Sequence, residues 1–329
     1  MRWSNRRTIT ATLLCAAAST WTIACTPAIQ PLSQSPAAVA AGDSAQTHAS
    51  LPTRIVTAAI VRQTLDSALQ QPQFRTATWG VLIVTQSGDT IYAHNASTLM
   101  IPASNMKIVT AATALAQLGP EFRFRPTALA LAADDTVPSD FGPMYDTAFL
   151  RTHSLRDVLP KMLKPSQNRL AEQLARTVAL EQTGSASRDS AIAITQRQLQ
   201  LWNIPSDGYI LSDGSGYDRG NYLSPATIVD ILSQMSRDTA FSAFYDALPI
   251  AGIDGTLARR MRASRAESNA HAKTGSLHSI RALSGYVATP AGTDVTFSFI
   301  CNAYTAPADQ VLRIMDSTVA LLAELSDVR

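Results

Sequence analysis

Two periods of hydrophobic residues run through this 329-residue chain, one typical of helices and one typical of strands. Apolar side chains recur every three or four positions, which predicts amphipathic helices, at residues 55–69, 155–163, 170–180, 192–201 and 308–325. Short apolar runs of strand-forming residues predict strands at residues 79–84, 90–94, 121–131, 270–277, 283–289 and 295–301. Ser224 followed by Pro225 predicts the start of a further helix, because serine caps a helix and proline fits its first turn.

The order of these elements places strands near both ends of the chain and helices in its middle. The turn at residues 87–89 joins the first two strands as a hairpin, and residues 132–152 are predicted to be rich in loops. Strands from both ends can pair in one sheet, so we predict an α/β (α+β) fold with a mainly antiparallel sheet, flanking helices and an inserted helical lobe. A cleft between two such lobes is a common ligand site. We expect one folded domain at 53–329, with a sheet lobe at 53–118 and 265–329 and a helical lobe at 119–264.

The first 25 residues are typical of an export signal. Arg2, Arg6 and Arg7 precede an apolar run at 9–18, which is too short to span a bilayer. Residues 22–25 resemble a bacterial lipobox, in which Cys25 would carry the lipid; Ala-x-Ala at 38–40 offers ordinary cleavage instead. Residues 26–52 are rich in Ala, Ser, Pro and Gln, which predicts a flexible linker. We expect the mature protein outside the cytoplasm, in the periplasm or anchored to the outer side of the cell envelope.

Composition excludes several classes of protein. Hydrophobic residues make up 46% of the chain, which is enough for a sizeable core and argues against wholesale disorder. The formal net charge of +2 is too close to neutral to indicate a nucleic-acid partner. Three cysteines and five scattered histidines offer no disulfide framework and no metal-ligand spacing. We therefore expect neither a metal nor another cofactor.

A serine and a lysine stand at the start of a predicted helix that follows Pro102. Ser104 and Lys107 are three positions apart, so they share one face of the helix and can touch. A serine hydroxyl beside an amine is a nucleophile beside a candidate base. The pattern Ser-x-x-Lys is common, however, and by itself indicates little.

Two further motifs follow in the chain. Ser166-Gln167-Asn168 stands at a predicted helix start, and Lys273-Thr274-Gly275-Ser276 lies on a predicted strand. Taken alone, the first motif could simply cap a helix and the second could be an exposed strand end. Together with Ser-x-x-Lys, however, they form the signature of penicillin-binding proteins and class A β-lactamases.

The chain resembles the low-molecular-mass class C penicillin-binding proteins. This resemblance extends over residues 166–174, 213–216, 221–225, 248–257, 272–277 and 283–286. It implies a β-lactamase/transpeptidase-like fold and a serine-type D-Ala-D-Ala carboxypeptidase or endopeptidase that acts on peptidoglycan stem peptides and binds β-lactam antibiotics as inhibitors. There are departures: Gln167 stands where Asp is usual, and Tyr217-Asp218 replaces Leu-Ser. The span from Lys107 to Ser166 is also too short for the family's extra domains, so we expect a shortened member.

The chemistry assigns a role to each residue of these motifs. Ser104 would be the nucleophile, and Lys107 its base once burial and the nearby charge of Lys273 lower the pKa of Lys107. Ser166 would relay protons to the leaving amine, and Asn168 would hold Lys107. Lys273, Thr274 and Ser276 suit a substrate carboxylate, and Gly275 would let the backbone of the strand come close to the ligand. By the resemblance, the backbone N–H groups of Ser104 and Ser276 would form an oxyanion hole.

Other functions remain as alternatives. A serine β-lactamase needs a glutamate-activated water, and no convincing Glu-x-x-x-Asn element is present in the helical lobe. A non-catalytic module that binds the cell wall or senses β-lactams is a third hypothesis, against which the complete motifs argue. Residues 213–216 are interpreted as a structural turn, and Asp254 and Arg281 as cleft residues without an assigned mechanism. The balance between carboxypeptidase and endopeptidase activity stays open.

Overall fold

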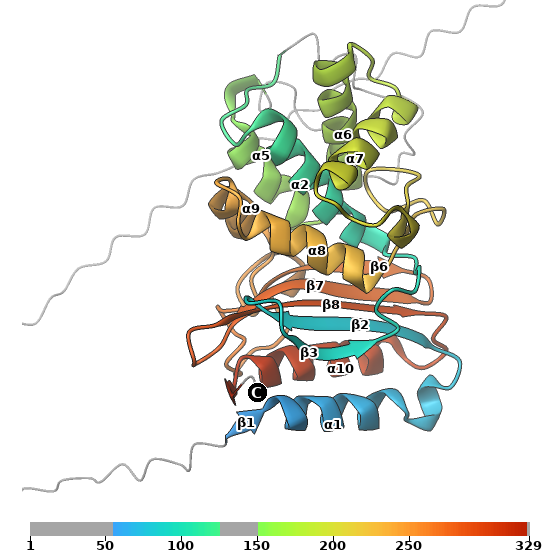
Figure 1. Cartoon of the computed structure of the whole chain (residues 1–329), viewed down its shortest axis with the longest axis vertical. Helices are drawn as coiled ribbons and strands as arrows, with labels where there is room; N and C mark the ends of the chain where they lie inside the picture. Colours follow the sequence, from blue (N-terminus) through green and yellow to red (C-terminus); the bar gives the residue numbers. More distant parts are fainter. Residues whose placement is uncertain (1–54, 126–150, 328–329) are drawn as a thin grey trace, which may run out of the picture. The chain divides into compact units, whose positions relative to one another are not determined.

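A five-stranded antiparallel sheet lies at the centre of the fold, with the strand order β3-β2-β8-β7-β6 (Figure 1). The computed structural model describes residues 55–125 and 151–327 of the chain. The strands are β2 (Thr78–Thr85), β3 (Thr90–His94), β6 (His271–Leu277), β7 (Ile280–Ala288) and β8 (Asp294–Asn302). Because β2 pairs with β8, strands from opposite ends of the sequence meet in one sheet, and the predicted α/β fold class with its mainly antiparallel sheet is confirmed.

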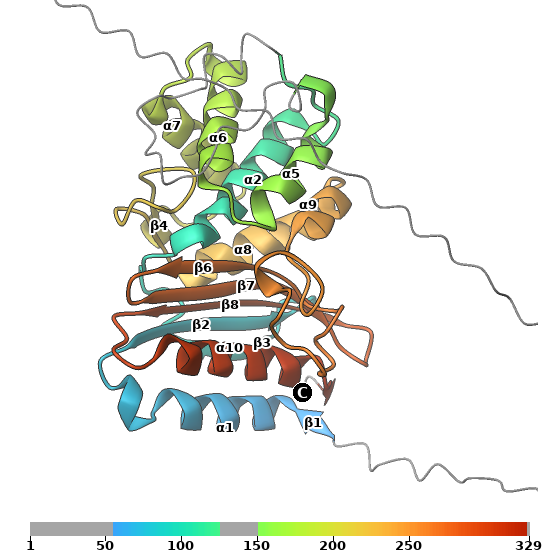
Figure 2. The ribbon, with the colours of Figure 1, turned by 180° about the vertical axis from the view of Figure 1, so that it is seen from behind.

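Helices cover both faces of this sheet. The helices α1 (Ala58–Leu69) and α10 (Ala308–Leu322) lie on one face, and α8 (Pro225–Met235) lies across the other (Figures 1 and 2). Neighbouring strand residues point to opposite faces. Leu283 of β7 therefore joins the core beneath α1 and α10, whereas Ala282 joins the core beneath α8. As predicted, α8 begins with Ser224 as its N-cap, whose hydroxyl accepts a hydrogen bond from Thr227 N, and with Pro225 at its first position.

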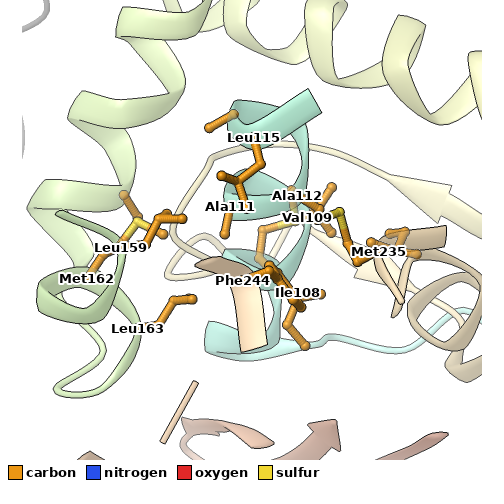
Figure 3. Close-up of a cluster of buried hydrophobic side chains, with 14 of the residues drawn as sticks. Ile108, Val109, Ala111, Ala112, Leu115, Leu159, Met162, Leu163, Met235 and Phe244 are labelled. Carbon is orange, nitrogen blue, oxygen red and sulfur yellow. The ribbon is translucent and has the colours of Figure 1, made fainter. Parts of the chain in front are cut away.

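The helical middle surrounds one central helix, α2 (Met106–Leu118). Every residue of α2 from Met106 to Leu115 is buried, which explains why this helix is apolar on nearly all sides. Leu159, Met162 and Leu163 approach it from α5, while Met235 comes from α8 and Phe244 from α9 (Figure 3). The other helices of this region are α5 (Leu155–Leu163), α6 (Asn168–Thr183), α7 (Arg188–Leu201) and α9 (Phe241–Ala247). A small two-stranded ribbon consists of β4 (Tyr209–Ile210) and β5 (Tyr222–Leu223).

Two predicted helices are wrong at one end. The helix predicted at 55–69 begins at Ala58, and the one predicted at 308–325 ends at Leu322. Val56, Thr57 and Leu325, which the prediction placed in these helices, instead belong to a parallel pair of short strands, β1 (Val56–Thr57) and β9 (Leu325–Asp327). Val56 N also donates a hydrogen bond to Ser326 Oγ at 3.2 Å. Local periodicity cannot detect such a pairing, because its partners are far apart in the sequence. The helix α9 was also missing from the prediction.

Several predictions fall outside the described residues. These are the export signal at 1–25 with Cys25, the linker at 26–52, most of the predicted strand at 121–131 and most of the loop-rich segment at 132–152. Within the described ranges, no helix has the length and apolar character needed to cross a membrane. The lobe boundaries stay predictions, although α2 packs mainly with the helical middle.

We predict that Phe244→Ala weakens the support of α2. Phe244 is fully buried in the cluster around this helix, so its truncation should lower the free energy of unfolding by about 3–5 kcal/mol. Urea denaturation followed by circular dichroism measures this loss. The control is Leu201→Ala, since Leu201 is 64% exposed and its truncation should change stability by less than about 0.5 kcal/mol. Equal losses in both variants would contradict the packing described here.

Candidate active site

Ser104 lies in a single 3-10 turn (Ala103–Asn105) that leads directly into α2. Lys107 Nζ donates a hydrogen bond to Ser104 Oγ at 3.0 Å, so the predicted contact between the two side chains is present. The turn is tied to the sheet by Asn105, whose buried Nδ2 donates to Ser284 Oγ on β7 at 2.7 Å. The sheet thereby sets the position of the serine, and the helix sets the position of the lysine.

The amine of Lys107 is fully buried and has three hydrogen-bond partners. Besides Ser104 Oγ, it contacts Asn168 Oδ1 and the Ser215 carbonyl oxygen, each at 2.7 Å. Burial lowers the pKa of Lys107 to about 7, although the carboxylates of Asp213 and Glu172 act in the opposite direction. Near neutral pH a substantial fraction of Lys107 is therefore an uncharged amine.

A second buried amine faces a second serine. Lys273 Nζ on β6 donates to Ser166 Oγ at 2.9 Å and to the Thr274 carbonyl oxygen at 2.8 Å. Burial holds the pKa of Lys273 well below its usual range, and the charge of Lys107 lowers it further. Burial and a neighbouring like charge, the two causes expected from the sequence, thus both act on this pair of lysines, and burial is the larger cause.

The segment that carries Ser166 has an unusual backbone. Ser166 adopts a φ of +63°, in the left-handed region that side chains other than glycine seldom occupy. The helix α6 begins only at Asn168, after Gln167, whose side chain makes no capping hydrogen bond. Ser166-Gln167-Asn168 is therefore more than a helix cap. It directs a hydroxyl to one buried lysine and an amide oxygen to the other.

The strand β6 lies at the edge of the sheet and carries the remaining predicted residues. Ala272 N donates to the Pro249 carbonyl oxygen, so it points away from β7. Because backbone N–H groups alternate in direction along a strand, those of Thr274 and Ser276 also point away from β7, to the open edge of the sheet. A Cβ on Gly275 would lie 2.6 Å from the Pro102 carbonyl oxygen. The glycine thus allows β6 to approach the serine turn itself, where the sequence analysis expected close approach to a ligand.

The loop at residues 249–257, which precedes β6 in the chain, is fastened to the segment that precedes Ser166. Lys164 Nζ donates to Asp254 Oδ2 at 2.5 Å, and Thr256 N donates to the Lys164 carbonyl oxygen at 3.0 Å. Thr274 Oγ1 in turn donates to Thr256 Oγ1 at 2.8 Å. Asp254 therefore helps to hold the Ser166 segment against β6, which gives it a structural role that the sequence analysis lacked.

Arg281, the other unassigned cleft residue, does not join this cluster. Its NH1 donates to the carbonyl oxygens of Leu277 and Ile280 at the turn between β6 and β7. Its guanidinium group also lies 5.6 Å from the ring centroid of Tyr304. Within the described ranges, no group of three or more His, Cys, Asp or Glu side chains is arranged to hold a metal ion.

The sequence analysis missed the loop at 213–216 and Glu172 as parts of the site. The loop was interpreted as a structural turn, yet its Ser215 carbonyl contacts Lys107. Glu172 Oε1 accepts hydrogen bonds from Gly214 N at 3.0 Å and Ser215 N at 2.7 Å. The sequence holds one indication that Glu172 lies near the site. Glu172 follows Asn168 by four positions, so both project from the same face of α6.

We predict that Gly216→Ala is far more damaging than Gly88→Ala. Both glycines have a positive φ, which costs alanine about 1–2 kcal/mol, but nothing lies within 4 Å of a Cβ on Gly88. A Cβ on Gly216 would lie 1.9 Å from the Ala103 carbonyl oxygen, so this variant should lose about 1–3 kcal/mol more. The free energies of unfolding from urea denaturation decide the matter. Equal losses would show that the loop does not press against the serine turn.

Comparison with known proteins places this geometry in a family. A model of the D-Ala-D-Ala carboxypeptidase 3 (S13) family matches residues 61–140 and 143–325. The D-alanyl-D-alanine carboxypeptidase of Actinomadura sp. (strain R39) is 34% identical over 196 residues, which are 57% of this chain and 35% of that protein. The D-alanyl-D-alanine carboxypeptidase DacB of Haemophilus influenzae is 33% identical over 154 residues, 46% of this chain and 32% of that protein. The matches thus span only about a third of the length of these relatives.

Solved structures share the fold. The crystal structure of penicillin binding protein 4 (dacB) from Haemophilus influenzae has a TM-score of 0.64 at 17% identity, and the match covers 79% of this chain and 99% of that chain. An extended-spectrum β-lactamase, TLA-1, has a TM-score of 0.60 at 12% identity, with 80% and 97% covered. At these identities the likeness concerns the fold alone, and it confirms the predicted β-lactamase/transpeptidase-like architecture.

Proposed function

The chain belongs to the D-Ala-D-Ala carboxypeptidase 3 (S13) family, and on that premise we propose that it is a serine DD-peptidase acting on peptidoglycan stem peptides through an acyl-enzyme on Ser104. The observation that carries this proposal is the contact of 3.0 Å between Ser104 Oγ and the fully buried Lys107 Nζ. A base with a pKa near neutrality beside a serine hydroxyl is what nucleophilic catalysis of this kind requires.

The partners of Lys107 favour its action as a base. A neutral amine has two N–H bonds and one lone pair. Asn168 Oδ1 and the Ser215 carbonyl oxygen can only accept hydrogen bonds, so they occupy both N–H bonds. The lone pair is then left for the hydroxyl hydrogen of Ser104, so in the neutral form Ser104 donates to Lys107, whereas the charged amine donates to Ser104 Oγ. In this arrangement Lys107 takes the proton as the Ser104 oxygen bonds to the substrate carbonyl carbon.

Ser166 is suited to return that proton. Lys273 Nζ donates to Ser166 Oγ, which directs the hydroxyl hydrogen of Ser166 toward another acceptor. We assign that acceptor as the leaving amine, which gains a proton as the amide C–N bond breaks, while Ser166 recovers one from Lys107. Water then hydrolyses the acyl ester on Ser104 and regenerates the enzyme.

The substrate carboxylate belongs, in this proposal, beside Lys273 and Thr274. Burial disfavours the charged form of Lys273, and an incoming carboxylate would stabilise that form, so binding and protonation support each other. The outward N–H of Ser276, together with that of Ser104, would stabilise the developing oxyanion. A donor of this kind contributes about 3–4 kcal/mol to the transition state.

The alternatives receive less support from the geometry. A β-lactamase of the type weighed above needs a glutamate that activates a deacylating water. Glu172 Oε1 is instead engaged by the backbone N–H groups of Gly214 and Ser215. A non-catalytic module that binds the wall or senses β-lactams would not need two buried lysines facing serines. Neither alternative has an observation of its own in its favour.

Location and maturation are part of the proposal. An enzyme acting on peptidoglycan must work outside the cytoplasm, which agrees with the arginine-rich, apolar start of the sequence. We propose export, with residues 1–25 as the signal and a peptidase domain from residue 53 onward. The mature protein is then either periplasmic, after cleavage at the Ala-x-Ala site at 38–40, or anchored to the outer side of the cell envelope through a lipid on Cys25. The balance between removal of terminal D-Ala and cleavage of cross-links follows from assays on both substrates.

We predict that benzylpenicillin forms a stable adduct with the protein through Ser104. Mass spectrometry should detect the adduct over hours in the wild type and in the control Ser87→Ala, and should detect none in Ser104→Ala. The wild type should also release D-alanine from a model stem peptide ending in D-Ala-D-Ala. Consumption of the drug without an accumulating adduct would instead favour a β-lactamase, and neither consumption nor adduct would favour a non-catalytic module.

We predict an acid limb near pH 7 in the rate constant of acylation. The neutral form of Lys107 is the reactive form, so the rate constant should fall about tenfold per pH unit below the pKa of about 7 and level off above it. Lys107→Arg should lower the rate by about 10²–10⁴-fold, because arginine stays charged. Lys161→Arg, an exposed site on α5, is the matched control. A rate constant that is flat between pH 5 and pH 9 would contradict this role.

A further inference from the structure

Two buried carboxylates lie behind Lys107, and no step of the proposed reaction uses them. The side chains of Glu172 on α6 and Asp213 in the adjoining loop belong to residues that are only 5% and 6% exposed. Burying an ionisable carboxyl group is unfavourable unless hydrogen bonds compensate for the lost water. Most of the hydrogen bonds that compensate here come from one short stretch of backbone.

The two carboxylates bind successive N–H groups of the loop. Glu172 Oε1 accepts from Gly214 N at 3.0 Å and from Ser215 N at 2.7 Å. Asp213 Oδ1 accepts from Ser215 N at 3.1 Å and from Gly216 N at 2.6 Å, while its Oδ2 accepts from Asp218 N at 2.8 Å. Three consecutive N–H groups thus point toward carboxylates.

The carbonyl groups of the same stretch point to the nucleophile helix. The Gly214 oxygen accepts from Thr110 Oγ1 at 2.6 Å, and the Ser215 oxygen accepts from Lys107 Nζ at 2.7 Å. Each peptide unit is planar, so fixing its N–H also fixes the direction of its C=O. Asp213, by holding Gly216 N, therefore orients the very peptide unit whose oxygen contacts Lys107.

Close packing reinforces this orientation. A Cβ on Gly214 would lie 2.9 Å from the Cβ of Ala175 on α6. On the other side, Gly216 presses on the Ala103 carbonyl group of the serine turn. Asn221 closes the loop, since its Nδ2 donates to Asp213 Oδ1 at 2.8 Å. The loop is therefore held between α6 and the serine turn.

We propose that Glu172 and Asp213 are positioning residues that aim the Ser215 carbonyl group at Lys107. Asp213 holds the peptide unit of this carbonyl directly, through Gly216 N, and Glu172 holds the preceding unit, whose oxygen Thr110 binds. This carbonyl takes one of the two N–H bonds of neutral Lys107, and so it determines that the lone pair points at Ser104. Without the two carboxylates the peptide units can rotate, and the lone pair of Lys107 loses its fixed direction. The inference rests on the proposed function, in which Lys107 is the base.

The test separates binding of a chromogenic cephalosporin from the acylation step, by stopped-flow measurement over a range of drug concentrations. Glu172→Ala and Asp213→Ala should lower the limiting acylation rate constant by about 10–100-fold, the effect expected for lost hydrogen bonds to a charged group. The dissociation constant of the non-covalent complex should change by less than about twofold, because neither residue touches the ligand in this proposal. Glu172→Gln keeps an oxygen acceptor for both N–H groups and should stay within about threefold of the wild-type rate.

The control variant is Asp316→Ala, which removes a partly buried carboxylate paired with Arg260 at 2.6 Å; Asp316 lies on α10, on the face of the sheet opposite α8 (Figure 1). It should acylate at the wild-type rate even if its melting temperature falls. If Glu172→Ala does not fold, Thr110→Val tests the same loop from the opposite side, because it removes the hydrogen bond to the Gly214 oxygen. This variant should also acylate at least about threefold more slowly.

Two outcomes would overturn the inference while the proposed function stands. The first is a wild-type acylation rate in Glu172→Ala or, if that variant does not fold, in Thr110→Val. The second is an equal loss of rate in Glu172→Gln and Glu172→Ala. The second outcome would mean that the charge of Glu172 matters and its hydrogen bonds do not. Failure of the wild-type protein to acylate at all would instead refute the proposed function, and this inference with it.

Discussion

The burial of one amine, that of Lys107, is the constraint on which the rest of the site depends. A lysine without contact with water is unfavourable in its charged form, and its hydrogen-bonding groups still need partners. The protein meets both requirements with an amide oxygen from Asn168, a backbone carbonyl from Ser215 and the hydroxyl of Ser104. The same three contacts that make the burial tolerable also orient the amine toward the serine.

These contacts require three distant parts of the chain to meet. Lys107 lies on α2, Asn168 begins α6, and Ser215 belongs to a loop held by Asp213 and Glu172. On the other side, the sheet supplies Lys273, and the ion pair of Lys164 with Asp254 holds the Ser166 segment close to it. Packing around α2 and pairing of the sheet therefore serve the site jointly, and a change in either alters its geometry. The matched residues span only about a third of the length of the curated relatives.

Much of the fold was predictable, because short-range signals specify it. Short apolar runs of strand-forming residues predicted the strands of the sheet, and the helical period predicted α5 with both ends correct. Ser224 and Pro225 marked the start of α8, since capping is a local interaction. The spacing of Ser104 and Lys107 indicated their contact for the same reason: residues three apart on a helix are neighbours whatever surrounds them.

The tertiary structure alone decided what depends on distant partners. Val56 and Ser326 pair across 270 positions, so periodicity extended both terminal helices too far. Glu172 meets Ser215 across 43 positions, and a single carboxylate on a helix gives no sign that a loop will bring its N–H groups there. The pKa of Lys107 near 7 follows from burial, which a sequence can suggest but only the assembled core can produce. The sequence by itself determined the motif residues of this site, from Ser104 to Ser276. The docking of the helices and the loop against the sheet decided how they face one another and added Glu172 and Ser215 to them, because hydrogen bonds and burial depend on positions in space.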